Sequence, residues 1–355
     1  MSGAEAATLP RGTRLGAWVI DRPLWPGRDG VLLARHATEE DRWAMIEAWP
    51  DAAFHRARHR RALTALRSLD HESVPQFLDS GSDHGMLWIA SDPGDGELLA
   101  DLLVVSPIDW RDACSIIVSV ARALAAAHAA GISHRNVSAE CIVVGADWSA
   151  RLIGWDLAMD DEALGQAANP PFGPLQYVAP EVIARPLTHG PRADLYALGI
   201  VFYETLVGRS PFPAAAHGGD RPEAAARLLE LKTRAEPLDL AAHAPPWIGQ
   251  LVAKATHAQV EKRLPDMDAF LGWIEAASGS WGRMGARPSL PPASRQLAPA
   301  LPALEPRLAG RSMAMPNREP IGPDPFWMLV AGVGGGIGGL LFTFVVVLVR
   351  EFGVV

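Results

Sequence analysis

The sequence has few cysteines and no excess of positive charge, and each shortage excludes a class of protein. Its two cysteines, Cys114 and Cys141, are too few for a disulfide framework and suit a reducing cytoplasm. Lysine and arginine total 32 against 40 aspartates and glutamates, which gives a formal net charge of −8. We therefore expect no general nucleic-acid binding. The first residues, MSGAEAATLPRG, contain no apolar core and do not resemble a signal peptide.

Composition divides the 355-residue chain into three regions. Residues 12–278 alternate strand-like and helix-like patterns, which is typical of a globular fold. Residues 279–325 are rich in proline. Such a segment cannot bury enough apolar surface to fold, so we interpret it as a juxtamembrane linker. Residues 326–349 contain no charged side chain.

The uncharged segment 326–349 is long enough to cross a membrane. As a helix it would extend roughly 36 Å, against about 30 Å for the hydrocarbon core of a bilayer. A buried core helix is the alternative. Arg307, Arg311 and Arg318 precede the segment, and only Arg350 follows it closely. The positive-inside rule then predicts a single-pass anchor in the cytoplasmic membrane, with the large N-terminal part in the cytoplasm.

The same segment contains two pairs of glycines four residues apart, Gly332 with Gly336 and Gly335 with Gly339. Small residues at this spacing let two membrane helices approach closely. The spacing therefore favours a homodimer through this helix, and a glycine-rich span that merely flexes is the alternative.

Five motifs follow one another within residues 12–278. They are HRNVSAEC (134–141), RLIGWDLA (151–158), YVAPE (177–181), ADLYALGIVFYETLVGRSPF (193–212) and EKRLPDMDAFL (261–271). In order and spacing they resemble the catalytic loop, the D-F-G turn, the A-P-E signature, the following helix and the closing arginine segment of bacterial Hanks-type serine/threonine protein kinases. The resemblance implies an α+β, bilobal protein-kinase-like fold. It has a small β-rich N-lobe (12–92), a larger helical C-lobe (93–278) and a cleft between them, followed by the C-terminal transmembrane helix.

The residues that hold this fold together in the family are present. They are His134, Arg135, Glu181, Asp194 and Arg263, and Trp155 is a sixth structural residue that differs from the family's. The resemblance implies that Asp194 holds the backbone of the catalytic loop and that Glu181 forms a buried ion pair with Arg263. Breaking such a pair from one side typically costs about 3–5 kcal/mol. Trp155 replaces the phenylalanine of D-F-G and can fill the same apolar slot.

The residues that perform phosphoryl transfer in the family are replaced. The reaction needs cations around the phosphates and a base beside the attacking hydroxyl. The aligned positions hold Glu47 for the phosphate-binding lysine, Ala62 for its glutamate partner, Asn136 for the catalytic aspartate, Ser138 for the next lysine, Cys141 for the metal-binding asparagine and Gly154 for the metal-binding aspartate. An amide is not a carboxylate base, a thiol suits magnesium poorly, and a carboxylate at Glu47 would repel a triphosphate.

The glycine-rich loop that covers the phosphates in the family is also altered. The segment WPGRDG (25–30) keeps Gly27 and Gly30, a weak nucleotide-binding pattern, but has Trp25 at the first glycine position. A bulky side chain there would keep a phosphate away from the backbone. Pro26 removes one backbone donor.

The segment 156–180, which aligns with the activation segment, contains no serine or threonine. Regulation by phosphorylating a hydroxyl there is therefore limited to Tyr177. Asp160, Asp161 and Glu162 can be interpreted as a fixed mimic of phosphate or as a solvated acidic turn.

Two smaller features can be interpreted either as functional or as ordinary helix surface. His55 and His59 lie one helical turn apart and could bind a metal, or could belong to a solvated basic face. The run Arg56 to Arg61 could contact acidic lipid or a partner, or could be a plain charged helix surface.

We predict a membrane-anchored pseudokinase that needs no cofactor and no metal, and that acts as a scaffold or allosteric regulator. Its expected partner is another protein, either an active kinase or a phosphoprotein. The alternative is an atypical active serine/threonine kinase that uses ATP and Mg²⁺ with Asp156, Glu140 or Asp160 as relocated metal ligands.

Overall fold

A computed structural model of the chain describes residues 9–25, 30–39, 41–160, 173–188, 190–212, 221–234 and 238–278. All of them belong to the first of two compact units into which the chain divides, Met1–Leu290. The predicted linker (279–325) and transmembrane helix (326–349) lie outside the described residues. The membrane anchor and the glycine-mediated dimer therefore stay predictions.

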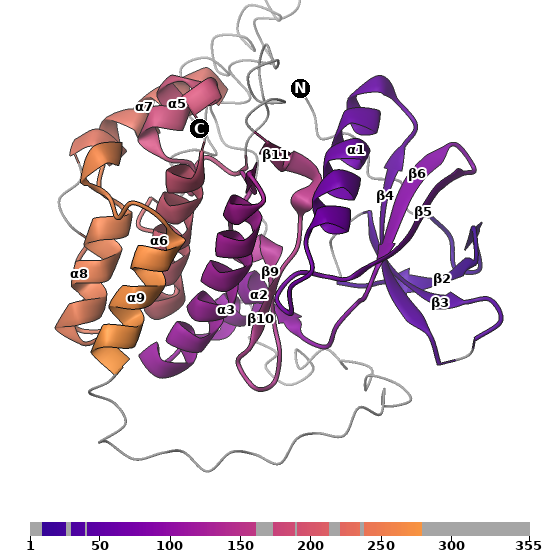
Figure 1. Cartoon of the computed structure of the whole chain (residues 1–355), viewed down its shortest axis with the longest axis horizontal. Helices are drawn as coiled ribbons and strands as arrows, with labels where there is room; N and C mark the ends of the chain where they lie inside the picture. Colours follow the sequence, from indigo (N-terminus) through magenta and orange to yellow (C-terminus); the bar gives the residue numbers. More distant parts are fainter. Residues whose placement is uncertain are drawn as a thin grey trace, which may run out of the picture. The chain divides into compact units, whose positions relative to one another are not determined.

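The N-terminal region is built on an antiparallel sheet of six strands in the order β1-β2-β3-β4-β6-β5 (Figure 1). The strands are β1 (Arg14–Leu15), β2 (Trp18–Pro23), β3 (Val31–His36), β4 (Trp43–Pro50), β5 (Phe77–Asp83) and β6 (Met86–Ser91). One face of this sheet buries a small core around Trp18 and Trp88. The other face packs against the helix α1 (Ala53–Ser68). The buried apolar residues of α1 belong to the main core of the domain.

Strand β4 places Glu47 on the α1 side of the sheet. Side chains alternate between the two faces of a strand. Ala44, Ile46 and Ala48 belong to the small core, so the odd-numbered positions of this strand face the other way. Glu47 pairs with Val31 of β3 and Ile89 of β6 and therefore lies mid-sheet.

The C-terminal region is helical. Its helices are α2 (Leu99–Val105), α3 (Trp110–Ala129), α5 (Pro180–Ala184), α6 (Pro191–Val207), α7 (Arg221–Arg234), α8 (Pro246–Ala255) and α9 (Met267–Ser278). Two small sheets accompany them, built from β7 (Glu97–Leu98), β9 (Ile142–Val144) and β10 (Ala150–Leu152), and from β8 (Ile132–Ser133) and β11 (Met159–Asp160). The structure thus has the predicted β-rich N-terminal region and helical C-terminal region.

Helices α3 and α6 form the centre of the helical region. The side chain of Asp109 caps α3 by accepting a hydrogen bond of 3.0 Å from the Arg111 backbone N–H. Within the described part of the chain, α3 is the one helix long and apolar enough to cross a membrane, but half of it is buried inside the protein. Such burial is typical of a core helix. Helix α6 is apolar on nearly every side and packs against both α3 and α8.

Candidate functional site

Asp194, in the first turn of α6, fixes the loop that contains His134 and Arg135. Its carboxylate is fully buried. It accepts hydrogen bonds from the backbone N–H of His134 (2.8 Å) and of Arg135 (2.9 Å), and His128 Nε2 lies 3.0 Å from Oδ2. Arg135 has a positive φ of 68°, a conformation that side chains other than glycine rarely adopt. The buried carboxylate holds the loop in this conformation.

The same loop is tied to the G-W-D turn, whose 3-10 helix η2 spans Trp155–Leu157. The imidazole of His134 donates from Nε2 to the Ile153 carbonyl (3.1 Å), and its ring lies edge-on to that of Trp155 with centroids 4.5 Å apart. Trp155 is buried and donates from Nε1 to the Leu152 carbonyl (2.8 Å). Trp155 therefore fills an apolar slot beside the loop, and its one polar atom is satisfied.

Asn136, Cys141 and Gly154 meet at one point. Asn136 Nδ2 donates to Cys141 Sγ at 3.3 Å. Gly154 has a φ of +80°, and a Cβ atom added to it would lie 2.8 Å from Cys141 Sγ and 3.3 Å from Asn136 Nδ2. The positions of the family's base and two metal ligands thus lie together. They hold the amide of Asn136, the thiol of Cys141 and Gly154, which has no side chain. This donor set does not fit Mg²⁺, which prefers carboxylate and other oxygen ligands.

The segment before the A-P-E signature lies directly on Asn136. The Gly173 N–H donates to the Arg135 carbonyl at 3.1 Å. A Cβ atom at Gly173 would come within 2.5 Å of Asn136 Oδ1. Ser138, two residues beyond Asn136, is fully buried, and its hydroxyl has no hydrogen-bond partner within the described ranges.

Glu47 is nearly buried, with 9% of its surface exposed. Burial, and secondarily the charge of Asp156, raises its pKa from 4.5 to about 8, although the charge of Arg58 opposes the shift. The carboxyl group is therefore mainly protonated at neutral pH. This corrects the expectation that Glu47 repels a triphosphate as an anion: the position lacks a cation, but it does not hold a full negative charge.

Two arginines of helix α1 contact Asp156. On the same helix, Ala62 occupies the position of the family's glutamate. Ala62 is fully buried and has no polar group to offer. Arg58 donates to Asp156 Oδ2 from Nε at 2.6 Å and places Nη2 2.5 Å from the same oxygen. Arg61 donates from Nε to the Asp156 backbone carbonyl at 3.0 Å.

The run Arg56–Arg61 is therefore not a plain charged surface. Sequence reasoning missed the inward orientation of Arg58 and Arg61, although helical spacing places both on the face of the buried Ala62 and Ala65. Arg60 is exposed, and Arg56 pairs with Asp51 at the surface.

Other metal-ligand candidates do not assemble. Across the described ranges, no group of three or more histidines, cysteines, aspartates or glutamates is arranged to hold a metal ion. His55 is buried, and burial lowers its pKa, while His59 Nε2 lies 3.2 Å from the Trp88 carbonyl. Glu140 and Asp160 are exposed.

Some residues of the glycine-rich loop and of the activation segment are not among the residues that the structure describes. Gly27, Asp161 and Glu162 lie outside the described residues. Gly30 is buried with a φ of +82°, and Trp25 belongs to the main core. Tyr177 is buried and donates to Glu204 Oε2 at 2.6 Å, so its hydroxyl is not exposed to a modifying enzyme.

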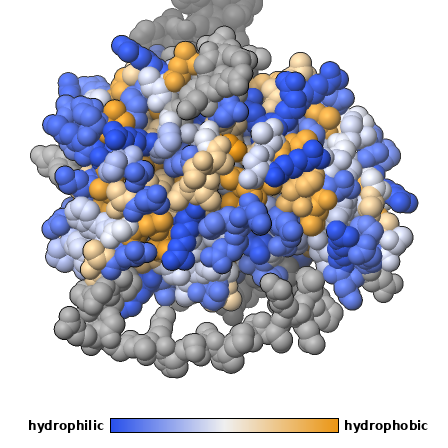
Figure 2. Space-filling model, in the orientation of Figure 1, coloured by the Kyte–Doolittle hydropathy of each residue, from blue (hydrophilic) through white to orange (hydrophobic). Residues whose placement is uncertain are grey.

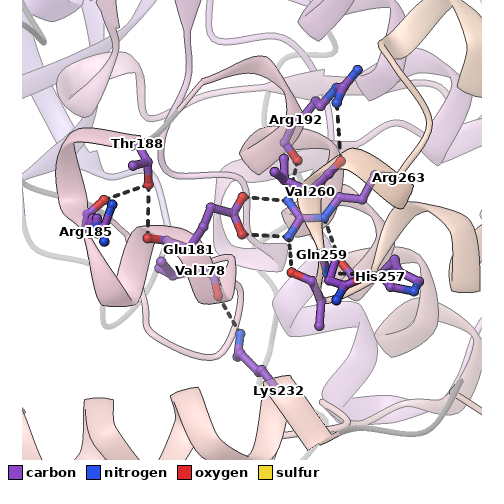
Figure 3. Close-up of polar contacts among 11 residues, drawn as sticks. Val178, Glu181, Arg185, Thr188, Arg192, Lys232, His257, Gln259, Val260 and Arg263 are labelled. Atoms are coloured by element: carbon purple, nitrogen blue, oxygen red, sulfur yellow. Dashed lines mark hydrogen bonds and ion pairs between the residues drawn. The ribbon is translucent and has the colours of Figure 1, made fainter.

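The A-P-E signature is anchored by two basic residues (Figure 3). Arg263 donates from Nη1 and Nη2 to the two carboxylate oxygens of Glu181, at 2.7 and 2.6 Å. Lys232 of α7 donates from Nζ to the carbonyls of Gln176 (2.8 Å) and Val178 (2.7 Å). Lys232 is buried, and burial lowers its pKa well below the ordinary value. Sequence reasoning found Arg263 and missed Lys232.

Three features together define the protein kinase class of folds. They are a β-rich region joined to a helical one, a catalytic-type loop held by a buried aspartate, and a glutamate–arginine pair at A-P-E. Residues 28–271 match the protein kinase domain family, and the chain belongs to this family. Its similarity to bacterial serine/threonine-protein kinases places it among their Hanks-type members.

Three relatives illustrate the similarity. The chain is 34% identical over 210 residues to serine/threonine-protein kinase PknE of Mycobacterium tuberculosis, covering 57% of this chain and 36% of the relative. It is 28% identical over 221 residues to the probable serine/threonine-protein kinase CPE1738 of Clostridium perfringens (61% and 31%). It is 27% identical over 232 residues to probable serine/threonine-protein kinase PknB of Lactococcus lactis (64% and 36%). The matched part thus spans about a third of each relative.

Proposed function

We propose that this member of the kinase family is a pseudokinase, which does not transfer phosphate and acts as a scaffold or allosteric regulator of another protein. The observation that carries the proposal is the cluster of Asn136, Cys141 and Gly154. It brings together the positions of the base and of both metal ligands and contains no carboxylate.

The chemistry of phosphoryl transfer gives this cluster its weight. Catalysis consists mainly of positioning and charge neutralisation by metal ions and cations around the phosphates. A neutral amide at Asn136 cannot accept the proton of an attacking hydroxyl as a carboxylate does. Glu47 supplies a mainly neutral carboxyl group in place of a cation. Asp156, the carboxylate of the G-W-D turn itself, is paired with Arg58.

A scaffold needs a maintained fold and a surface for its partner. The fold is maintained by Asp194, by the Glu181–Arg263 pair and by Trp155. Figure 2 shows apolar patches between polar ones on one face of the domain. Among the described residues, five large apolar residues are at least half exposed: Phe54, Val104, Val105, Leu187 and Leu231. We propose an active kinase or a phosphoprotein as the partner, and segment 326–349 as the anchor that brings it to the cytoplasmic membrane.

The test is a titration of the full-length protein, purified in detergent, with ATP in the presence and absence of Mg²⁺. We expect no Mg²⁺-dependent rise in melting temperature and no transfer of labelled phosphate to a general protein substrate. PknE, treated in the same way, is the positive control. Label transfer that depends on Mg²⁺ and disappears in Asp156→Asn would support the active-kinase alternative and overturn the proposal.

A further inference from the structure

The contact between α1 and the G-W-D turn joins two parts of the chain that are far apart in sequence. Its centre is the ion pair between Arg58 and Asp156, separated by 98 residues. Asp156 is almost buried, with 7% of its side chain exposed, and Arg58 is 29% exposed. Arg61 adds a hydrogen bond to the backbone of the same residue. All three groups lie where α1 packs against η2.

The geometry gives this pair more strength than a surface ion pair has. Two nitrogens of one guanidinium meet one carboxylate oxygen, at 2.6 and 2.5 Å. Charge-assisted hydrogen bonds of this kind are about twice as strong as neutral ones. Exclusion of water weakens dielectric screening, and loss of either partner would leave a nearly buried charge without compensation.

The pair also reverses the charges of the family's arrangement. There the helix supplies a glutamate and strand β4 a lysine, and here these positions are Ala62 and Glu47. The helix now supplies the cations, and the turn supplies the carboxylate. Helix α1 is therefore attached to the turn directly.

We propose that the Arg58–Asp156 pair, supported by Arg61, is a latch that holds α1 in one position without nucleotide, metal or phosphorylation. The surface of α1 is then presented to a partner in a constant form. The inference rests on the proposed function in one respect, because Asp156 must bind arginine and not a metal ion.

Hydrogen–deuterium exchange of the α1 amides tests the latch in the full-length protein. Arg58→Gln and Asp156→Asn should each accelerate exchange in α1 at least tenfold, while α6 keeps its wild-type rates. The double variant should exchange no faster than the faster single variant, because both remove the same interaction. Arg60→Gln is the matched control, since Arg60 is exposed on the same helix, and it should exchange as the wild type does.

Wild-type exchange in both single variants, or equal acceleration in Arg60→Gln, would overturn the latch. If Arg58→Gln does not fold, Arg58→Lys keeps the charge but loses the second donor. We expect about a threefold acceleration there, and none would count against the proposal. Wild-type protein with Mg²⁺ and ATP should show unchanged α1 exchange, whereas a tenfold gain in protection would contradict the latch.

These outcomes separate the two proposals. Mg²⁺-dependent transfer of labelled phosphate with unchanged α1 exchange would contradict the pseudokinase and leave the latch intact. Wild-type α1 exchange in the Arg58 and Asp156 variants, with no phosphate transfer by the wild-type protein, would contradict the latch and leave the pseudokinase intact.

Discussion

The guanidinium of Arg263 and the carboxylate of Glu181 form a two-pronged ion pair, in which the arginine side chain is fully buried and the glutamate side chain is 20% exposed. Arg263 also donates to the carbonyls of Arg192 (3.0 Å) and His257 (2.7 Å). One side chain thus joins α5, the start of α6 and the segment before α9.

Arg263→Gln should therefore destabilise the protein by about 3–5 kcal/mol, because it leaves the Glu181 carboxylate and two carbonyls without their donor. Urea unfolding followed by circular dichroism measures this change. Arg234→Gln is the control, since Arg234 pairs with Glu230 at the surface with both side chains more than half exposed. Exposed pairs contribute about 0–1 kcal/mol. Equal losses in the two variants would show that the Arg263 network carries no special weight.

Gly154→Ala should destabilise the domain more than Gly131→Ala does. Both glycines have a left-handed backbone, with φ of +80° and +75°, so both substitutions cost about 1 kcal/mol of strain. A Cβ atom at Gly131 meets nothing within 4 Å, whereas one at Gly154 lies 2.8 Å from Cys141 Sγ. We expect a further loss of about 1–3 kcal/mol at Gly154 from this overpacking.

Adding Cys141→Ala to Gly154→Ala checks the cause. Removal of the sulfur should recover most of the extra loss, after allowance for the cost of Cys141→Ala alone. Strictly additive effects would mean that the thiol does not fill the space of the missing aspartate side chain.

Much of the fold could be predicted because the motifs that identify it hold backbone segments in place. Asp194 fixes the loop of His134 and Arg135 through backbone N–H groups, and Trp155 needs only an apolar slot. The resemblance to the kinase family implied each of these contacts, because the motifs that carry the resemblance are present in the sequence.

The inward charges could not be predicted in the same way. Charged side chains belong in water unless a partner compensates them, and the partner of Arg58 is 98 residues away. Lys232 is harder still, because it binds the backbone carbonyls of Gln176 and Val178, which any residues could supply. The ionisation of Glu47 likewise depends on burial in three dimensions.

The predicted anchor, residues 326–349, should make the protein behave as an integral membrane protein. The full-length protein should pellet with membranes and be released by detergent but not by high salt, because residues 326–349 would lie in the hydrocarbon core. Ile337→Arg places a charge near the middle of the segment, where it costs about 2.5–3.5 kcal/mol on insertion scales, and should increase the soluble fraction. Ala303→Arg in the linker is the control and should pellet normally. Release of the wild-type protein by salt alone would contradict a spanning helix.

Glu47 should make the protein less stable as the pH rises. The folded state raises the pKa of this carboxyl group from 4.5 to about 8, so between these values the folded protein keeps a proton that the unfolded chain has lost. Stability contributed by the protonated group is then complete below about pH 4.5 and decreases until about pH 8, by roughly 5 kcal/mol in total. Glu47→Gln mimics the protonated form. It should match the wild type near pH 5 and exceed it near pH 8 in urea unfolding.

The comparison of Glu47→Gln with Glu97→Gln isolates the effect of burial. Glu97 is exposed on β7, so its replacement removes one negative charge from the domain without removing a buried carboxyl group. A stability gain of Glu47→Gln over the wild type that grows with pH and is absent in Glu97→Gln would establish Glu47 as a buried, proton-holding residue. If the two variants have the same pH profile, Glu47 is ionised in the folded protein. The position of the family's lysine would then hold a negative charge at neutral pH, as the sequence alone had suggested.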